Sequence, residues 1–362
     1  MKPPASEVSA FSDAYTESRR KLLAAAQQRD NARVTSLPND HRGDNGQTLC
    51  TDAIWLGPSD AENVLVHLSG LHGVEGYVGG AVQVDWLRRH HSGLPPKTAL
   101  VLVHAINPFG MANLRRVNAD NIDLNRNALI DHESYEGASD AYRILDPVLN
   151  PTAIPRRPNA FYLQAARSLA RFGFRAVKQA VAEGQYEFPR GLFYGGDSLA
   201  AEIRTLMEWL ESQLSAARRI GVIDIHSGLG RWGRDSLLVD VDPESAEFNR
   251  LRMAFGSRIA PLSPTGVAYR IRGAFLTALP QTARHATWTC MGQEFGTFKP
   301  IRVLRALIEE NAWRQWGDDD THHWSVEGLR STFCPAAPRW RQAILTRGAD
   351  LIRQHLQCAA DY

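Results

Sequence analysis

The amino-acid sequence predicts a single α/β domain built on a mixed, mainly parallel sheet flanked by helices. Three continuously apolar runs, Val64–Leu68, Leu100–Ile106 and Ile220–Ile225, have the character of strands that are covered on both faces. Helices are expected between them at Gly79–Arg89 and Leu199–Ser215. This alternation is typical of an open α/β sheet, whose ligands bind beyond the carboxyl ends of the strands.

The remaining elements are expected near the two ends of the chain. A surface helix is expected from about Asp13 to Arg29, because apolar and charged positions alternate there at helical spacing. A polar loop over Pro38–Gln47 and a strand near Thr51–Leu56 should follow it. The last helix, Arg339–Gln357, is interpreted as a packing element.

Residues 127–196 are interpreted as an insertion within this 1–362 domain. The segment holds a proline-rich stretch, Pro147–Pro158, and one helix from about Phe161 to Glu183. Long loop-rich segments of this kind usually have a functional reason. We therefore expect the insertion to lie near the active site and to narrow it.

The composition restricts the class of protein. Of 362 residues, 44% are hydrophobic and 22% are charged, as in globular domains with an ample core. A net charge of +2 indicates no nucleic-acid partner. The sequence has no apolar run of about 18 residues and no secretory signal at its N-terminus, so no membrane partner and a cytoplasmic location are expected. The four cysteines are scattered and indicate neither a disulfide framework nor a cysteine zinc site.

The string His72-Gly73-Val74-Glu75 is the main functional signal. It places an imidazole and a carboxylate three positions apart, where the strand Val64–Leu68 gives way to a glycine-rich turn. In such a turn both side chains can point to the same side. A second strand, Ile220–Ile225, ends directly before His226. Two nitrogens and one oxygen are the ligands of many catalytic zinc sites, which keep a fourth position for water.

The order of these candidates resembles that of the zinc carboxypeptidase superfamily. In that superfamily a short histidine–glutamate pair is followed, after a long gap, by a histidine at a strand end. Here His226 comes 151 positions after Glu75. No HExxH string, which would set two histidines one helical turn apart, occurs in the chain. The resemblance extends from Val64 to about Lys299.

Four further motifs carry the same resemblance. Asn107-Pro108-Phe109-Gly110 is similar to the superfamily's Asn-Pro turn, and Arg115-Arg116 to its carbonyl-polarising arginine. Asp123-Leu124-Asn125-Arg126 is similar to its substrate clamp, and resembles the succinylglutamate desuccinylase and aspartoacylase branch in particular. Glu294, 68 positions after His226, matches the catalytic glutamate. The whole also resembles an uncharacterised bacterial group placed beside the carboxypeptidases.

The resemblance implies one zinc ion (Zn²⁺) per chain, held by His72, Glu75 and His226. Zinc would lower the pKa of a bound water and polarise the scissile carbonyl group. Glu294 would be the general base that takes the proton of that water and passes it to the leaving amine. The run Trp288-Thr289-Cys290-Met291-Gly292 before it and Phe295 after it indicate an enclosed setting, which is unusual for an unpartnered charge.

The resemblance also implies an arginine that stabilises the oxyanion, and Arg116 is the candidate. Arg116 lies ten positions before Arg126, which is a longer gap than in the aspartoacylase branch. Its neighbour Arg115 could face the substrate instead, and the sequence does not decide between them.

Substrate binding is expected from Asn125 and Arg126, because a guanidinium group matches a free carboxylate in a two-point contact. Asp123 could accept a hydrogen bond from the second ring nitrogen of His72, or could simply cap a turn. Tyr269, 25 positions before Glu294, is a further substrate-binding candidate because carboxypeptidases carry a mobile tyrosine near this place.

The predicted function is zinc-dependent hydrolysis of an amide bond next to a free carboxylate. Both peptides, as in a carboxypeptidase, and N-acyl-amino acids, as in an aspartoacylase-like deacylase, remain open as substrates. Two histidines and a carboxylate also describe the facial triad of non-haem Fe(II) oxygenases, which would leave Glu294 unexplained. A zinc-binding protein without catalytic activity is the non-enzymatic alternative. Neither a phosphate-binding glycine motif nor a GxSxG serine motif is present.

Overall fold

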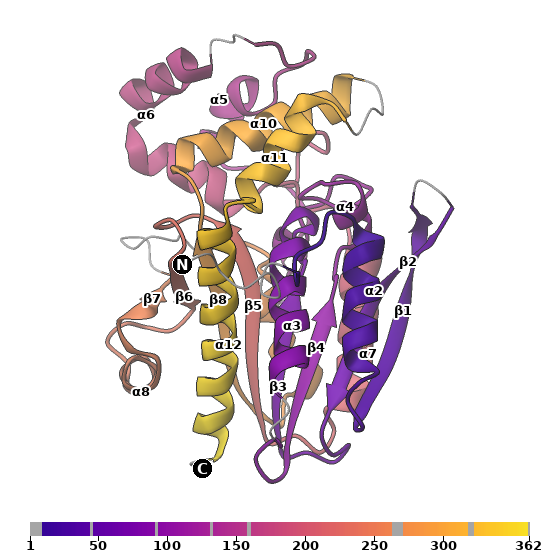
Figure 1. The fold of residues 1–362 in the computed structure, drawn as a ribbon. Coiled ribbons are helices and arrows are strands. Elements are labelled where there is room, and N and C mark those ends of the chain that lie inside the picture. The colour runs from indigo at the N-terminus through magenta and orange to yellow at the C-terminus, as the bar shows by residue number, and fades with distance from the viewer. Residues whose placement is uncertain are drawn as a thin grey trace.

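The computed structural model describes residues 9–43, 46–90, 93–130, 133–157, 161–262, 271–317 and 322–360. Its centre is an eight-stranded sheet with the strand order β1-β2-β4-β3-β5-β8-β6-β7 (Figure 1). Four neighbouring pairs are parallel and three are antiparallel, which confirms the mixed, mainly parallel sheet. The strands are β1 (Ala32–Arg42), β2 (Thr48–Leu56), β3 (Asn63–Ser69), β4 (Thr98–His104), β5 (Arg219–Gly228), β6 (Asp235–Val239), β7 (Ile259–Pro261) and β8 (Thr287–Gly296).

The order of the central strands creates a switch point. After β3 the chain crosses through α3 (Gly76–Arg89) to β4 on one side of β3, and it later returns to β5 on the other side. Connections that leave a central strand in opposite directions open a crevice at the carboxyl ends of the strands. In this sheet the switch point lies where β3 and β5 end.

Helices cover both faces of the sheet, which explains why the central strands are apolar without alternation. One face packs on α2 (Tyr15–Ala26), α3 and α12 (Pro338–Ala360), seen in front of the sheet in Figure 1. The other face packs on α7 (Ala201–Gln213). Successive residues of β3 take opposite sides: Leu65 belongs to the first core and Val66 to the second.

A third group of helices lies beyond the end of the sheet at which β3 and β5 finish (Figure 1). Apolar residues from these helices form one cluster with Val74, which follows β3. The helices are α5 (Asp140–Leu149), α6 (Phe161–Glu183), α10 (Pro300–Trp316) and α11 (Trp324–Phe333). Residues 127–196 supply α5 and α6, so this segment does lie close to the candidate site. Its status as an insertion in one domain stays a prediction.

Shorter elements complete the described part of the chain. They are α4 (Pro108–Ala112), α8 (Ala246–Phe255), α9 (Phe275–Ala278), η1 (Gly73–Glu75), η2 (Leu124–Arg126), η3 (Gly256–Arg258) and η4 (Leu279–Ala283). No helix in the described ranges has the length and apolar character needed to cross a bilayer.

Several boundaries differ from the sequence predictions. The prediction of a loop over Pro38–Gln47 is wrong for the first part of that range. There β1 continues through Arg42, which pairs with Thr48 of β2. β1 is an edge strand, where a proline and exposed polar residues are tolerated. In addition, β5 and β8 run past their apolar segments, so His226 and Glu294 lie within strands and not after them.

Candidate metal and catalytic site

The turn after β3 is shaped by close backbone contacts. His72 precedes the single 3₁₀ turn η1, which places the Glu75 side chain on the side of the His72 ring. Gly73 has no room for a side chain, because a Cβ there would lie 2.1 Å from the carbonyl carbon of Gly110. The amide groups of Gly73 and Val74 donate to the backbone carbonyls of Arg116 and Arg115, at 3.1 and 2.8 Å. The ligand turn and the arginine loop are therefore one rigid unit.

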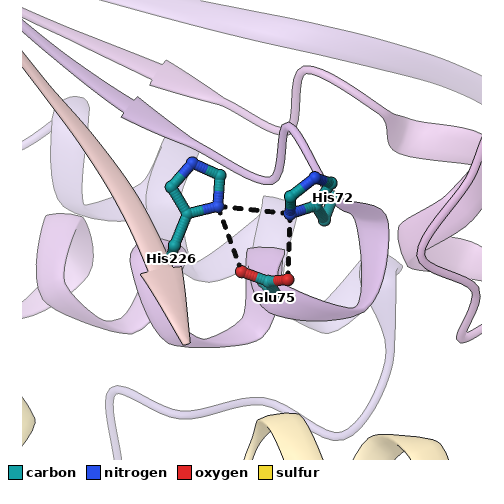
Figure 2. A group of neighbouring side chains, drawn as sticks. All are labelled: His72, Glu75 and His226. Atoms are coloured by element: carbon teal, nitrogen blue, oxygen red, sulfur yellow. Dashed lines mark hydrogen bonds and ion pairs between the residues drawn. The ribbon is translucent and has the colours of Figure 1, made fainter. Parts of the chain in front are cut away.

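His72, Glu75 and His226 converge on one point (Figure 2). His72 Nδ1 lies 2.9 Å from Glu75 Oε1, and His226 Nδ1 lies 3.2 Å from Glu75 Oε2. The two Nδ1 atoms are 3.2 Å apart. All three residues are buried, with exposed fractions of 3, 1 and 8%. Three sequence-predicted ligands, two of them 151 positions apart, are thus brought together.

The geometry of this cluster fits a zinc ion. Ligand atoms about 2.0–2.1 Å from a tetrahedral zinc lie about 3.3 Å from one another, close to the distance between the two Nδ1 atoms. The Nε2 atoms point away from the cluster, toward Asp123 Oδ1 at 3.2 Å and Asp224 Oδ2 at 2.7 Å. An ionised carboxylate can only accept, so each Nε2 carries a proton, and Nδ1 is the nitrogen of each ring that would bind a metal once it has no proton.

The acidic ligand is held in its charged form. Burial by itself would raise the pKa of Glu75, but the neighbouring His72 and His226 outweigh it and hold that pKa below its ordinary value. The backbone amide of Ser227 also donates to Glu75 Oε2 at 2.9 Å. Burial opposes ionisation of Asp123 too, and the charges of Arg116 and Arg126 keep its pKa well below the usual range.

Glu294 lies on β8 directly beside His226, its register partner on β5. Neighbouring strands are about 4.8 Å apart, so the half-buried carboxylate borders the metal cluster. Its Oε1 accepts a hydrogen bond from the amide of Leu229 at 2.8 Å. Burial, and then the negative charge of Glu75, raise the pKa of Glu294 to about 7. The carboxyl group is thus poised to exchange a proton near neutral pH.

The two adjacent arginines point in different directions. Arg116 Nη1 lies 3.3 Å from Glu75 Oε1, and its Nε donates to Asp123 at 3.0 Å. Arg115 is buried on the other side, where it donates to Asn121 at 2.9 Å and lies 3.4 Å from Glu310 of α10. The structure therefore brings Arg116, and not Arg115, to the group formed by His72, Glu75 and His226.

Arg126 and Asn125 lie next to this group. Arg126 Nη1 lies 3.4 Å from Asp123, and its Nη2 donates to the carbonyl of Ala182 at 2.9 Å. Its Nε is buried with no hydrogen-bond partner among the described residues. Asn125 is half-buried, and its Oδ1 accepts from the amide of Phe275 at 3.2 Å. Arg126 thus keeps one donor without a partner among the described residues, and the clamp stays a prediction. Tyr269 falls outside the described residues.

Two residues at the site were missed by the sequence reasoning. Asp224 lies two positions before His226, and on a strand this spacing places both side chains on one face. That signal was available. Phe193 comes from the 127–196 segment, and its ring centre lies 5.7 Å from the Arg116 guanidinium and 5.4 Å from that of Arg126. No short-range pattern could have placed Phe193 there.

One protein family matches most of the chain. The sequence profile of one family, DUF2817, matches residues 11–347. The chain belongs to that family. DUF2817 is described as a protein of unknown function. A search of curated proteins gives no match for this DUF2817 chain.

Several solved structures are similar to this DUF2817 chain. One is the carboxypeptidase A from Helicoverpa armigera, with 14% sequence identity, 88% of this chain and 74% of that chain covered, and a TM-score of 0.47. Another is bovine thrombin-activatable fibrinolysis inhibitor in complex with tick carboxypeptidase inhibitor, with 10% identity, coverage of 94% and 99%, and a TM-score of 0.47. A third is murein-tripeptide amidase MpaA from Escherichia coli O157, with 16% identity, coverage of 88% and 99%, and a TM-score of 0.38. At these identities the three structures are similar to this chain in fold alone.

Proposed function

We propose that this DUF2817 protein is a zinc-dependent hydrolase that cleaves an amide bond next to a free carboxylate. The observation that carries the proposal is the convergence of His72, Glu75 and His226, with Glu294 on the neighbouring strand. Two imidazoles and one carboxylate with an acidic group beside them are the parts that amide hydrolysis by a metal enzyme requires.

Zinc would be held by Nδ1 of both histidines and by the Glu75 carboxylate, and when bound it supplies a Lewis acid at the reacting carbonyl group. Glu294 takes a proton from the water whose oxygen attacks the carbonyl carbon. As the carbon–nitrogen bond breaks, Glu294 returns that proton to the leaving amine nitrogen. The raised pKa of Glu294, about 7, supports this role because the group can both accept and release a proton near neutral pH.

Arg116 stabilises the negative charge that develops on the carbonyl oxygen. Its Nε and Nη1 are held by Asp123 and Glu75, which fix the guanidinium beside the cluster. A donor that is already oriented loses no reorganisation energy during the reaction. The fixed position of Arg116 supports an electrostatic role, whereas Arg115 is held on the α10 side by Glu310.

Arg126 and Asn125 bind the free carboxylate of the substrate. The buried Nε–H of Arg126 has no partner among the described residues, and an unsatisfied buried donor costs about 1–3 kcal/mol. A substrate carboxylate would remove this cost. The substrate is accordingly a peptide with a free C-terminus or an N-acyl-amino acid, and the product is the released amino acid.

The test is the metal content of the purified protein by plasma mass spectrometry, followed by a hydrolysis screen of both substrate classes. We expect about one zinc per chain in the wild type and none in His226→Ala, with hydrolysis lost in the same variant. Iron in place of zinc would favour an oxygenase. Zinc without hydrolysis of any carboxylate-bearing amide would favour a binding protein without catalytic activity.

A further inference from the structure

Asp224 is a buried carboxylate with a single hydrogen-bond partner in the part of the chain that the structure describes. It lies in the middle of the sheet on β5, between Leu68 of β3 and Gly292 of β8, and its exposed fraction is 0%. Its Oδ2 lies 2.7 Å from His226 Nε2. Its Oδ1 is buried and has no hydrogen-bond partner among the described residues. A half-satisfied carboxylate at the centre of a sheet costs stability, and an apolar side chain would serve the fold better.

The position of Asp224 relative to His226 is rigid. The two residues are two positions apart on one strand, so their side chains share a face. β5 is hydrogen-bonded on both sides, with Leu68 opposite Asp224 on β3 and Glu294 opposite His226 on β8. The strand therefore cannot slide, and the carboxylate is presented to Nε2 in one geometry.

The direction of the hydrogen bond decides the chemistry of the ring. Because the carboxylate accepts, Nε2 of His226 donates, and in the neutral ring the lone pair is on Nδ1. That Nδ1 atom faces His72 and Glu75, each at 3.2 Å. His72 is arranged in the same way through Asp123, but Asp123 also contacts Arg116 and Arg126. Among the described residues Asp224 bonds to His226 alone, so its effect is directed to this ligand.

We propose that Asp224 is a positioning residue that fixes the tautomer and ring orientation of His226 and thereby sets the affinity of the site for zinc. The inference rests on the metal site of the proposed function but not on the reaction, because Asp224 contacts neither the substrate nor the reacting atoms.

The experiment measures zinc affinity by competition with a chromophoric chelator in the full-length wild type, Asp224→Ala and Asp224→Asn. Loss of a partner behind a metal ligand weakens metal binding by about 10- to 100-fold, and we expect that loss for the alanine variant. The asparagine variant should fall between it and the wild type. Its carbonyl oxygen can still accept from Nε2–H. In the flipped orientation of the side-chain amide, the NH₂ group would donate to Nε2, and the ring proton would have to be on Nδ1 instead.

Asp235→Asn is the matched control, because Asp235 is a buried carboxylate on β6 that pairs with Arg258 and Arg347. This variant should lower the stability of the metal-free protein and leave zinc affinity unchanged. Asp224→Ala should lower zinc affinity, and the cobalt-loaded variant should show an altered visible absorption spectrum. A general structural role for Asp224 would instead lower metal-free stability without changing the spectrum.

Zinc affinities of both Asp224 variants within twofold of the wild type would overturn the proposal, as would an equal loss in Asp235→Asn. If the alanine variant does not fold, the nearly isosteric asparagine variant decides by the same criterion. A wild type that binds no zinc refutes both proposals. A wild type that binds zinc but hydrolyses no amide refutes only the proposed function, because the affinity series does not depend on turnover.

Discussion

Replacing Glu294 by glutamine should make the metal-free protein more stable and the enzyme inactive. Burial and the charge of Glu75 raise the pKa of Glu294 from its ordinary 4.5 to about 7. Each tenfold change in proton affinity corresponds to about 1.4 kcal/mol, so the ionised carboxylate lowers folding stability by about 3 kcal/mol. The glutamine side chain stays neutral and can keep the hydrogen bond from the Leu229 amide.

The sign of the effect follows from linkage. The pKa of Glu294 is higher in the folded state, so folding favours the protonated carboxyl group. Its favourable contribution is fully present below pH 4.5 and is lost as the pH rises toward about 7. The advantage of Glu294→Gln should therefore be near zero at pH 4.5 and reach about 3 kcal/mol above pH 7.

Urea unfolding of the metal-free proteins at pH 5 and pH 8 measures this difference. Glu202→Gln is the matched control, because the Glu202 carboxylate bonds to Asn39 and Asn118 and should change neither the pH dependence nor turnover. In the zinc-loaded variant, loss of the base should lower kcat by at least about 100-fold with the metal content unchanged. Equal pH dependence of stability in wild type and Glu294→Gln would refute the desolvation argument. Near-normal turnover would remove Glu294 from the mechanism.

Four further outcomes are expected. Arg126→Ala should raise KM about tenfold or more for substrates with a free carboxylate, since a charge-assisted hydrogen bond is worth about 1.5–3 kcal/mol; an equal effect on carboxyl-amidated substrates would contradict the clamp. The kcat/KM of the wild type should rise with pH through the pKa of Glu294, at or below about 7 because a bound cation favours the ionised form; a pH-independent rate would count against the base. Removal of the metal by a chelator should abolish turnover and zinc should restore it, whereas activity that survives dialysis without metal would argue against a metal enzyme. Gly73→Ala should lower stability in urea by about 1–3 kcal/mol, because its Cβ would press on the backbone of Gly110; a neutral effect would show that the turn can relax.

The central strands could be predicted because burial on both faces leaves an uninterrupted apolar run. This applies to β3, β4 and β5, which all coincide with predicted segments. The edge strand β1 leaves no such signal, because its exposed side carries polar residues and Pro38. The extension of β5 to His226 and of β8 to Glu294 was also missed. Polar side chains at a site interrupt the apolar pattern although the backbone pairing continues.

Local chemistry was readable from the sequence, whereas the direction of side chains in irregular loops was not. His72 and Glu75 are three positions apart in one turn, so their proximity depends on the backbone of a short segment. For Arg115 and Arg116 the sequence offered no choice. Their directions are decided by partners from distant segments, Glu310 for the first and Glu75 for the second.

The sequence by itself therefore determined the fold class, the residue types of the metal site and the order in which they occur. The tertiary structure alone decided which arginine faces the cluster, that Glu294 stands beside His226, and that Phe193 covers the two arginines at the site. The physical reason is the range of the forces that shape each feature. Turns and strands follow from neighbouring residues along the chain, but contacts across the sheet and with the 127–196 segment form only when remote segments pack together.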